Sequence, residues 1–460
     1  MDEKERKYQF MTILSESHPG LTFEEYRDSC IFLLFYHYLC LRYDEGLEEN
    51  YKLHSMARMA IRGKLQMDSF LRFIENASLF LHVLCPEYQL TEFSFYRGLQ
   101  EVETQEKQKS YARFIRKLVK KLDSWGTDEE LLASYPVCFE TLMIEFSNMK
   151  KETGIPDPIL DLFEIFFEEN RARQERKVFH PEFRYGSLLR RLLADCTDPL
   201  YCGYETGEDY IELMEILCFM YGIPEDKYFF SNRKEWIRQR KFLGQMDTVC
   251  VYKPEGVEAG EYLSAEEANR PIKNLLNVKT KGELPYLLTA FPLLRQGGEI
   301  IAVLPSSLLY REGRENQIRR YLAEEMNCLD TVILLPDSVF PSIGQQEVFL
   351  YLKKDRDPKD VMFFDCSAME NLDPEALKEI RRAWKERKSV SGFCHRADPE
   401  EISANDYNLN LPRYIKKPTG IEIVDIDTKR ERIDMINKEL KEIDERLEMY
   451  RRDLELDALL

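Results

Sequence analysis

Residues 246–256, MDTVCVYKPEG, are a run of apolar β-forming residues that ends in a polar turn. Parallel sheets place ligands and reacting groups at the carboxyl ends of their strands, so this turn is a candidate working edge. Chemistry on a flipped nucleotide base needs a polar side chain there to accept the target amino group, and an aromatic ring to stack on the base. Tyr252, Lys253, Pro254 and Glu255 supply neither in the expected order, and an ordinary surface turn is the alternative interpretation.

A second candidate site lies in 176–205. Here a short apolar entry leads into a loop with a single glycine, Gly186, then a helical stretch and the strand-like LYCGYE, which ends at Glu205. A loop after one strand and an acid at the tip of the next is the arrangement that holds a ribose in nucleotide sites. Such loops need several glycines, and Arg184 and Tyr185 stand beside the only one here. Taken alone, the loop is better interpreted as an ordinary strand–helix turn.

The elements that must position these residues fall into distinct regions of the 460-residue chain, which is long enough for two or three domains. Residues 1–148 are dominated by helical patterns. Thr22 followed by Glu25 has the spacing of a capping box, which predicts the start of a helix. Further helices are predicted for 69–85 and 111–125. We therefore expect an all-helical N-terminal domain.

From residue 149 onward, β-rich runs alternate with helical stretches, which predicts an α/β domain whose largely parallel sheet is covered on both faces. The runs 347–354 and 361–365 are nearly a hairpin, which predicts a mixed edge on the sheet. The strand candidates are 200–205, 247–252, 298–305, 329–336, 347–354 and 361–365, and helices are predicted for 209–222, 284–297 and 314–326.

The segment 421–460 carries an apolar heptad seam that is interrupted at Lys429, and most of its other residues are charged. A helix with so narrow a stripe cannot bury it alone. It either packs back on the chain or pairs with a partner helix, and the narrow seam and dense charge favour a partner. The seam consists of Ile426, Ile433, Ile436, Leu440, Ile443, Leu447, Tyr450 and Leu454.

The net charge of −18 argues against a free-standing nucleic-acid binder, since such proteins are usually basic. A local patch or a partner would have to supply positive surface. Basic clusters occur at 107–121, 233–241 and 380–388, and their ordinary interpretation is a set of solvated helix faces.

The eleven cysteines include no C-x-x-C pair, and no histidine-rich cluster accompanies them, so we expect reduced thiols and no metal site. The apolar run 30–40 is too short to span a bilayer. The charged N-terminus argues against a signal peptide. We expect a cytoplasmic protein without a membrane partner.

Longer segments together resemble the modification (M) subunit of type I restriction–modification systems, which are N6-adenine DNA methyltransferases. The two most specific are the GG and VLP block of FPLLRQGGEIIAVLP and the closing NDYNLNLPRY at 405–414. The resemblance implies a Rossmann-like class I methyltransferase domain over 149–420, with a mixed, mostly parallel sheet, and a C-terminal coiled-coil helix over 421–460. The segments that carry it are 23–45, 154–167, 291–322, 329–354 and 397–415.

The departures from the family fall at its chemical positions. The family's cofactor loop, Asp-Pro-x-x-Gly-x-Gly-Gly, aligns on 180–187, where only Pro181 and Gly186 remain. The family's catalytic Asn-Pro-Pro-Phe/Tyr aligns on 252–255, where the asparagine and the aromatic residue are replaced. Glu205 matches the ribose-binding acid. Two sites are altered while the scaffold pattern is intact, so the resemblance implies a pseudo-methyltransferase that keeps the fold and has lost the reaction.

Such a protein would be a structural, DNA-clamping or regulatory subunit of a phage-defence complex. Its expected partners are a specificity (S) subunit, contacted through the C-terminal helix, an active M subunit in one arrangement, and DNA through the complex. No cofactor is expected. The alternative is a divergent but active S-adenosylmethionine-dependent methyltransferase, in which Asp247 or Tyr252 would have to orient the amino group. A third hypothesis is a different small ligand, with Glu205 still holding a ribose.

Overall fold

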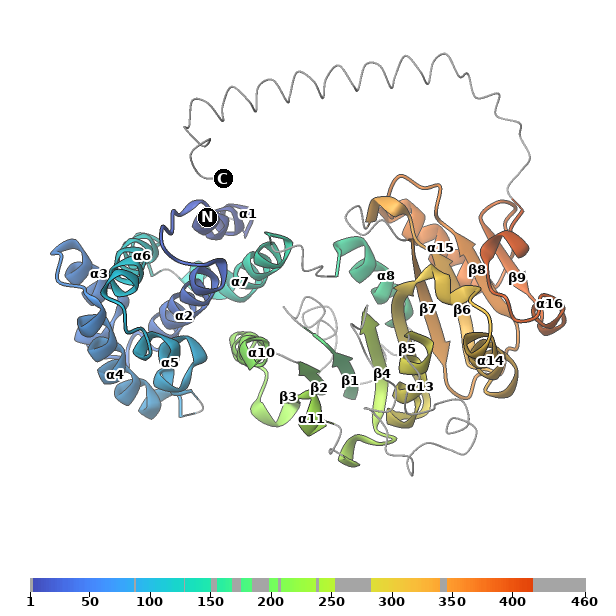
Figure 1. The fold of residues 1–460 in the computed structure, drawn as a ribbon, viewed down its shortest axis with the longest axis horizontal. Coiled ribbons are helices and arrows are strands. Elements are labelled where there is room, and N and C mark those ends of the chain that lie inside the picture. Colours follow the sequence, from blue (N-terminus) through green and yellow to red (C-terminus); the bar gives the residue numbers. More distant parts are fainter. Residues whose placement is uncertain are drawn as a thin grey trace, which may run out of the picture. The chain divides into compact units, whose positions relative to one another are not determined.

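The computed structural model describes residues 3–86, 88–127, 129–149, 155–167, 175–183, 198–205, 208–236, 240–252, 283–339 and 346–416 (Figure 1). The compact unit considered below is Met1–Ile415. The predicted heptad helix at 421–460 lies outside the described residues, and the domain limits at 148 and 420 remain predictions.

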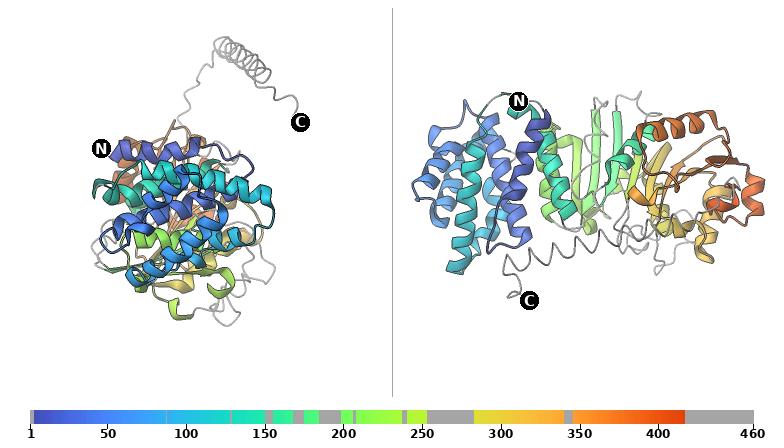
Figure 2. Two further views of the ribbon diagram at one scale, coloured as in Figure 1. Left: turned by 90° about the vertical axis from the view of Figure 1, so that its left-hand side faces the viewer. Right: turned by 90° about the horizontal axis from the view of Figure 1, so that it is seen from above.

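The N-terminal region is helical, as predicted, and its helices pack along one another (Figure 2). The longest apolar segment forms α2, which starts with the predicted capping box. The Glu25 N–H donates to Thr22 Oγ1 at 3.3 Å, and Glu25 Oε2 accepts from the Thr22 N–H at 2.7 Å. The helices are α1 (Glu3–Met11), α2 (Phe23–Arg42), α3 (Leu53–Ile61), α4 (Met67–Leu84), α5 (Ser94–Gln100), α6 (Gln105–Asp123) and α7 (Glu129–Met149).

Among the described residues, nine strands form one sheet in the order β3-β2-β1-β4-β5-β7-β6-β8-β9. Strands β1 to β5 pair in parallel, whereas β7 runs antiparallel to both β5 and β6. This is the predicted mixed, mostly parallel sheet. The strands are β1 (Glu175–Pro181), β2 (Asp198–Glu205), β3 (Tyr228–Asn232), β4 (Met246–Tyr252), β5 (Leu294–Pro305), β6 (Leu329–Leu334), β7 (Glu347–Lys353), β8 (Val361–Asp365) and β9 (Cys394–Ala397).

Helices cover both faces of the sheet (Figure 1). Because side chains alternate along a strand, Tyr201 and Tyr204 of β2 point into different cores. The core that contains Tyr201 is completed by α8 (Asp157–Phe167), α10 (Glu208–Met220) and α15 (Pro374–Glu386). The core that contains Tyr204 is completed by α11 (Arg233–Trp236), α13 (Glu283–Ala290), α14 (Arg314–Arg320) and α16 (Pro399–Ala404).

Three details differ from the expectation. The helix predicted over 284–297 ends at Ala290, because Pro292 follows in a 3₁₀ turn and β5 begins at Leu294. The two runs expected to be nearly a hairpin, β7 and β8, are not neighbours, since β6 lies between them. The edge strands β3 and β9 are additional; β9 has only four residues, two of them polar.

The helical region is attached to α10, the helix that follows β2. The Tyr88 hydroxyl donates to the carbonyl of Glu215 at 2.8 Å, and the Ser94 hydroxyl donates to the Glu212 carboxylate at 2.7 Å. No helix in the described part of the chain combines the length and hydrophobicity needed to cross a bilayer. The cysteines that the structure describes are all free and buried.

Candidate functional site

The candidate site is the sheet edge where the strand order reverses. From β1 the chain winds outward through β2 and β3, then returns to β4 on the other side of β1. Crevices at such switch points bind ligands in open α/β sheets. Three predicted positions end the strands here: Pro181 ends β1, Glu205 ends β2 and Tyr252 ends β4. The strand register keeps them level, with Pro181 opposite Tyr204 and Phe179 opposite Val249. The structure therefore brings these three residues to one edge.

His180 is the buried residue just before the end of β1. It is 2% exposed, and its Nδ1 shares a 2.7 Å hydrogen bond with the hydroxyl of Tyr201. Burial lowers the pKa of His180 from 6.5 to about 3, so the imidazole is neutral at physiological pH. This position consequently contributes no charge to the edge, and its Nδ1 is already engaged.

Phe183 fills the space over β2. Its ring is 3% exposed and lies 4.9 Å from the Phe230 ring, centroid to centroid. A Cβ added at Gly203 would lie 2.4 Å from Phe183 Cδ1 and 2.5 Å from the His180 carbonyl oxygen, so glycine is required there. Glu182, which precedes Phe183 in the chain, has a positive φ of 53°, and its N–H donates to the Tyr204 carbonyl at 2.8 Å. The start of the β1 loop is thus packed tightly against β2.

Glu205 and Tyr252 are 3% and 8% exposed, and both interact with other residues. The remaining predicted positions, Gly186, Lys253, Pro254 and Glu255, lie outside the described residues, as do Arg184 and Tyr185.

Asp247 lies at the opposite end of β4 from Tyr252, about 16 Å away at the usual rise of a strand. Its carboxylate accepts the Lys177 N–H at 2.8 Å and pairs with Arg295. Asp247 therefore ties β1, β4 and β5 together at the amino edge, and it cannot orient a group at the carboxyl edge.

A family model, N-6 DNA Methylase, matches residues 139–422, more than half of the chain. The chain belongs to the N-6 DNA methylase family. Among curated members, the type I restriction enzyme MjaVIII methylase subunit of Methanocaldococcus jannaschii is 30% identical over 343 residues, covering 67% of this chain and 58% of that protein. The MpnII methylase subunit of Mycoplasma pneumoniae is 29% identical over 186 residues, covering 39% of this chain and 34% of that protein. The chain thus spans between 34% and 58% of these relatives' own lengths.

Solved structures give the same fold. The methyltransferase subunit of a type I restriction-modification system from Streptococcus thermophilus superposes with a TM-score of 0.72 at 20% identity, covering 90% of this chain and 100% of that chain. A second chain comes from a structural study of complex assembly and conformational transition of the type I R-M system. It gives a TM-score of 0.62 at 18% identity, covering 96% of this chain and 98% of that chain.

The closing segment of this family member, NDYNLNLPRY, is held by one buried arginine. Arg319 is 1% exposed and donates to three carbonyl oxygens, those of Tyr407, Leu308 and Arg311, each at 2.8 Å. Two of these acceptors belong to the turn after β5, and Tyr407 belongs to NDYNLNLPRY. The arginine therefore clamps the closing segment to the strand beside β4.

Other contacts fix the course of NDYNLNLPRY. Asp406 and Tyr407 have φ values of 54° and 53°, and the Leu409 N–H donates to the Leu309 carbonyl at 2.9 Å. The Tyr414 ring stacks on Phe363 with centroids 4.0 Å apart. Packing and loop order therefore account for this signature.

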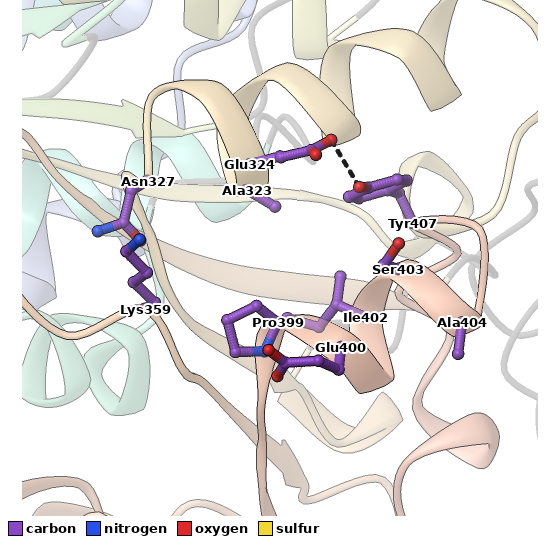
Figure 3. A pocket seen from close by; sticks show the side chains of 10 residues that line it. All are labelled: Ala323, Glu324, Asn327, Lys359, Pro399, Glu400, Ile402, Ser403, Ala404 and Tyr407. Carbon is purple, nitrogen blue, oxygen red and sulfur yellow. Dashed lines mark hydrogen bonds between the residues drawn. The ribbon is translucent and has the colours of Figure 1, made fainter.

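A cavity of about 570 Å³ lies beside this segment, away from the predicted site residues (Figure 3). Tyr407 points across it and donates to Glu324 at 2.6 Å. Among the described residues, no group of three or more His, Cys, Asp or Glu could hold a metal ion. The lining residues are Ala323, Glu324, Asn327, Lys359, Pro399, Glu400, Ile402, Ser403, Ala404 and Tyr407.

Sequence reasoning missed the partners of the edge residues. In the sheet, His180 of β1 lies opposite Gly203 of β2, and Tyr201 comes two residues before Gly203. Because side chains alternate along a strand, the side chains of His180 and Tyr201 point to the same face of the sheet. This register is known only from the structure, so no local sequence pattern signalled the His180–Tyr201 pair. The clamp by Arg319 had a weak signal, a cation between the apolar residues Ile318 and Leu322.

Proposed function

We propose that this chain is a catalytically inactive M-subunit-like protein that serves a type I complex as a structural and DNA-clamping subunit. The observation that carries the proposal is the replacement of the cofactor loop's aspartate by His180. The family's cofactor loop begins with aspartate at this position, whereas here the group is a buried imidazole that is neutral and bonded to Tyr201.

The residues of the edge do not fit S-adenosylmethionine. That cofactor carries a positive sulfonium and a positive ammonium group, which a carboxylate attracts and a neutral imidazole does not. Phe183 adds a buried ring directly over Gly203, where the loop would have to leave room for a ligand. Of the two acidic positions in the family's cofactor site, Glu205 is retained and the aspartate of the loop is replaced by His180.

The base-accepting position supports the same conclusion. An asparagine carbonyl would accept a hydrogen bond from an adenine amino group. Tyr252 stands there instead, and its ring is part of the apolar core that also contains Cys250 and Val303. Loss of one such oriented contact typically lowers a rate by about 100–1000-fold.

The proposed partners are a specificity subunit, an active M subunit and DNA, in a cytoplasmic complex. One similar structure comes from a study of complex assembly in the type I R-M system, which supports a role in assembly. We propose the heptad segment 421–460 as the contact with the specificity subunit.

The test combines two measurements on the purified full chain. Transfer of labelled methyl groups from S-adenosylmethionine to duplex DNA should stay at background, with or without a specificity subunit. Size-exclusion chromatography should show a complex with that subunit, and deletion of 421–460 should abolish it. Methyl transfer above background would refute inactivity, and a complex that survives the deletion would refute the tail contact.

Glu205 favours the second candidate, a divergent active methyltransferase, because the ribose-binding acid is retained at the end of β2. In that case the methyl-transfer assay gives a signal that Glu205→Gln abolishes.

A further inference from the structure

Helix α6 carries a stripe of cations at the surface of a protein that is acidic overall. Between residues 107 and 122 the sequence has seven basic residues and no acidic one, in a chain of net charge −18. The helix is anchored by its other face, which buries Tyr111, Phe114, Ile115 and Leu118 among other residues. The basic face is therefore displayed by a rigid element.

Three of the seven cations serve the fold. Lys107 pairs with Glu25 at 2.5 Å, Lys117 pairs with Glu16 at 2.7 Å, and Lys121 pairs with the same Glu16. These pairs tie α6 to the region around the start of α2.

The other four, Lys109, Arg113, Arg116 and Lys120, follow one another at intervals of four, three and four residues. This spacing puts them on a single helix face about 16 Å long. Three are exposed and Arg116 is partly exposed, and none forms an ion pair with a residue that the structure describes. We call these four residues the α6 stripe.

The neighbouring helix reinforces the charge. Helix α3 packs along α6, contains no acidic residue, and carries exposed Arg58; exposed Arg62 follows directly at its C-cap. By contrast, the basic cluster 380–388 is partly structural, because Arg387 pairs with Asp330 and Asp360.

We infer that the α6 stripe binds the phosphate backbone of double-stranded DNA. Duplex DNA carries a negative charge about every 1.7 Å along its axis. A linear row of cations therefore complements a duplex better than it complements a compact anion. Contacts of this kind position a duplex without reading its sequence. The inference deepens the DNA-clamping part of the proposed function and assigns it to the helical region.

The test is fluorescence anisotropy of a labelled duplex with the full chain, over a salt series that starts at low salt. The test variant is the quadruple Lys109→Gln, Arg113→Gln, Arg116→Gln, Lys120→Gln. A matched control removes four exposed charges from α15 and its end: Lys378→Gln, Arg382→Gln, Lys385→Gln, Lys388→Gln.

We expect the stripe variant to bind at least about tenfold more weakly at low salt, with a salt slope shallower by about 3 to 4, whereas the control keeps both. Circular dichroism should show both variants folded, because the stripe faces away from the core. An unchanged slope in the stripe variant, an equal loss in the control, or no duplex binding by the wild-type chain would overturn the inference. The last outcome would favour an acidic protein as the occupant. None of these outcomes bears on methyl transfer, so inactivity is tested separately.

Discussion

The carboxyl edge of β1, β2 and β4 differs sharply from the neighbouring half of the sheet around β5 to β9. At the edge, His180, which aligns with the aspartate of the family's cofactor loop, is bonded to Tyr201, and Phe183 of the same loop packs against Gly203. In the other half, Arg319 clamps the family's closing signature through three backbone carbonyls. In both halves the buried side chains hold backbone and neighbouring residues in place, but only the edge half contains positions that align with the family's chemistry.

This contrast explains how the family's scaffold signatures can persist beside altered residues at its chemical positions. The signatures that carry the resemblance hold the scaffold through buried hydrogen bonds, and leaving such groups unpaired is costly. In the proposed inactive subunit, the cofactor loop is released from the constraint that binding imposes, and a buried side chain such as Phe183 is tolerated at its start. The two halves should therefore respond differently to substitution.

The largest effect is expected for Arg319→Met. The variant leaves three buried carbonyl groups without their donor and should lower the free energy of unfolding by roughly 3–5 kcal/mol. Denaturant unfolding measures the loss. Arg320→Met is the matched control, because Arg320 is exposed and makes surface contacts, an ion pair with Glu324 and a cation–π contact with the Tyr407 ring; the unfolding midpoint of this variant should hardly move. Equal losses of unfolding free energy in the two variants would show that Arg319 does not clamp the closing segment.

The next effect concerns the packed edge. Gly203→Ala forces a Cβ to within 2.4 Å of Phe183 and 2.5 Å of the His180 carbonyl, and should cost about 3 kcal/mol. In a Phe183→Ala background the same change should cost less, because one of the two clashes is gone. A double-mutant cycle measures this coupling. Gly98→Ala, where nothing lies within 4 Å, should be neutral or stabilising. Strict additivity would show that Phe183 does not pack on Gly203.

Acid should weaken the edge through His180. Its pKa is about 3 when folded and 6.5 when unfolded, so below pH 6.5 the unfolded state binds more protons and stability falls. Between pH 6.5 and 5 the loss should be about 2 kcal/mol for this residue. His180→Gln should flatten this part of the pH dependence of stability. His37→Gln should have the same effect, because burial also lowers the pKa of His37 to about 3. A profile unchanged by His180→Gln would mean that the imidazole is charged in the folded protein.

The smallest effect is expected for Tyr252→Asn, which restores the family's residue at the end of β4. Because the cofactor edge remains altered, methyl transfer to duplex DNA should stay at background. Tyr252→Phe serves as a control, and thermal unfolding checks that both variants fold. Transfer by the asparagine variant would mean that only one of the two sites has been lost.

Much of this architecture was predictable from the sequence, for identifiable reasons. Alternating apolar runs revealed the strands β2, β4, β5, β6, β7 and β8, and the capping box at Thr22 marked the start of α2. Alignment to the family brought Pro181, Glu205 and Tyr252 to one edge, where the structure also has them. The pairing of His180 with Tyr201 could not be predicted from local patterns, because it depends on register between strands. The short edge strand β9 and the order of β6 and β7 depend likewise on long-range pairing.

The central claim is that the β1 edge no longer binds its cofactor, and calorimetric titration of the full chain with S-adenosylmethionine tests it most directly. An M subunit with an intact Asp-Pro-x-x-Gly-x-Gly-Gly loop is the positive control under the same conditions. We predict no saturable heat with this chain at millimolar cofactor, and none with its Glu205→Gln variant. Saturable binding with a micromolar Kd that Glu205→Gln abolishes would contradict the account and show that the cofactor site is functional.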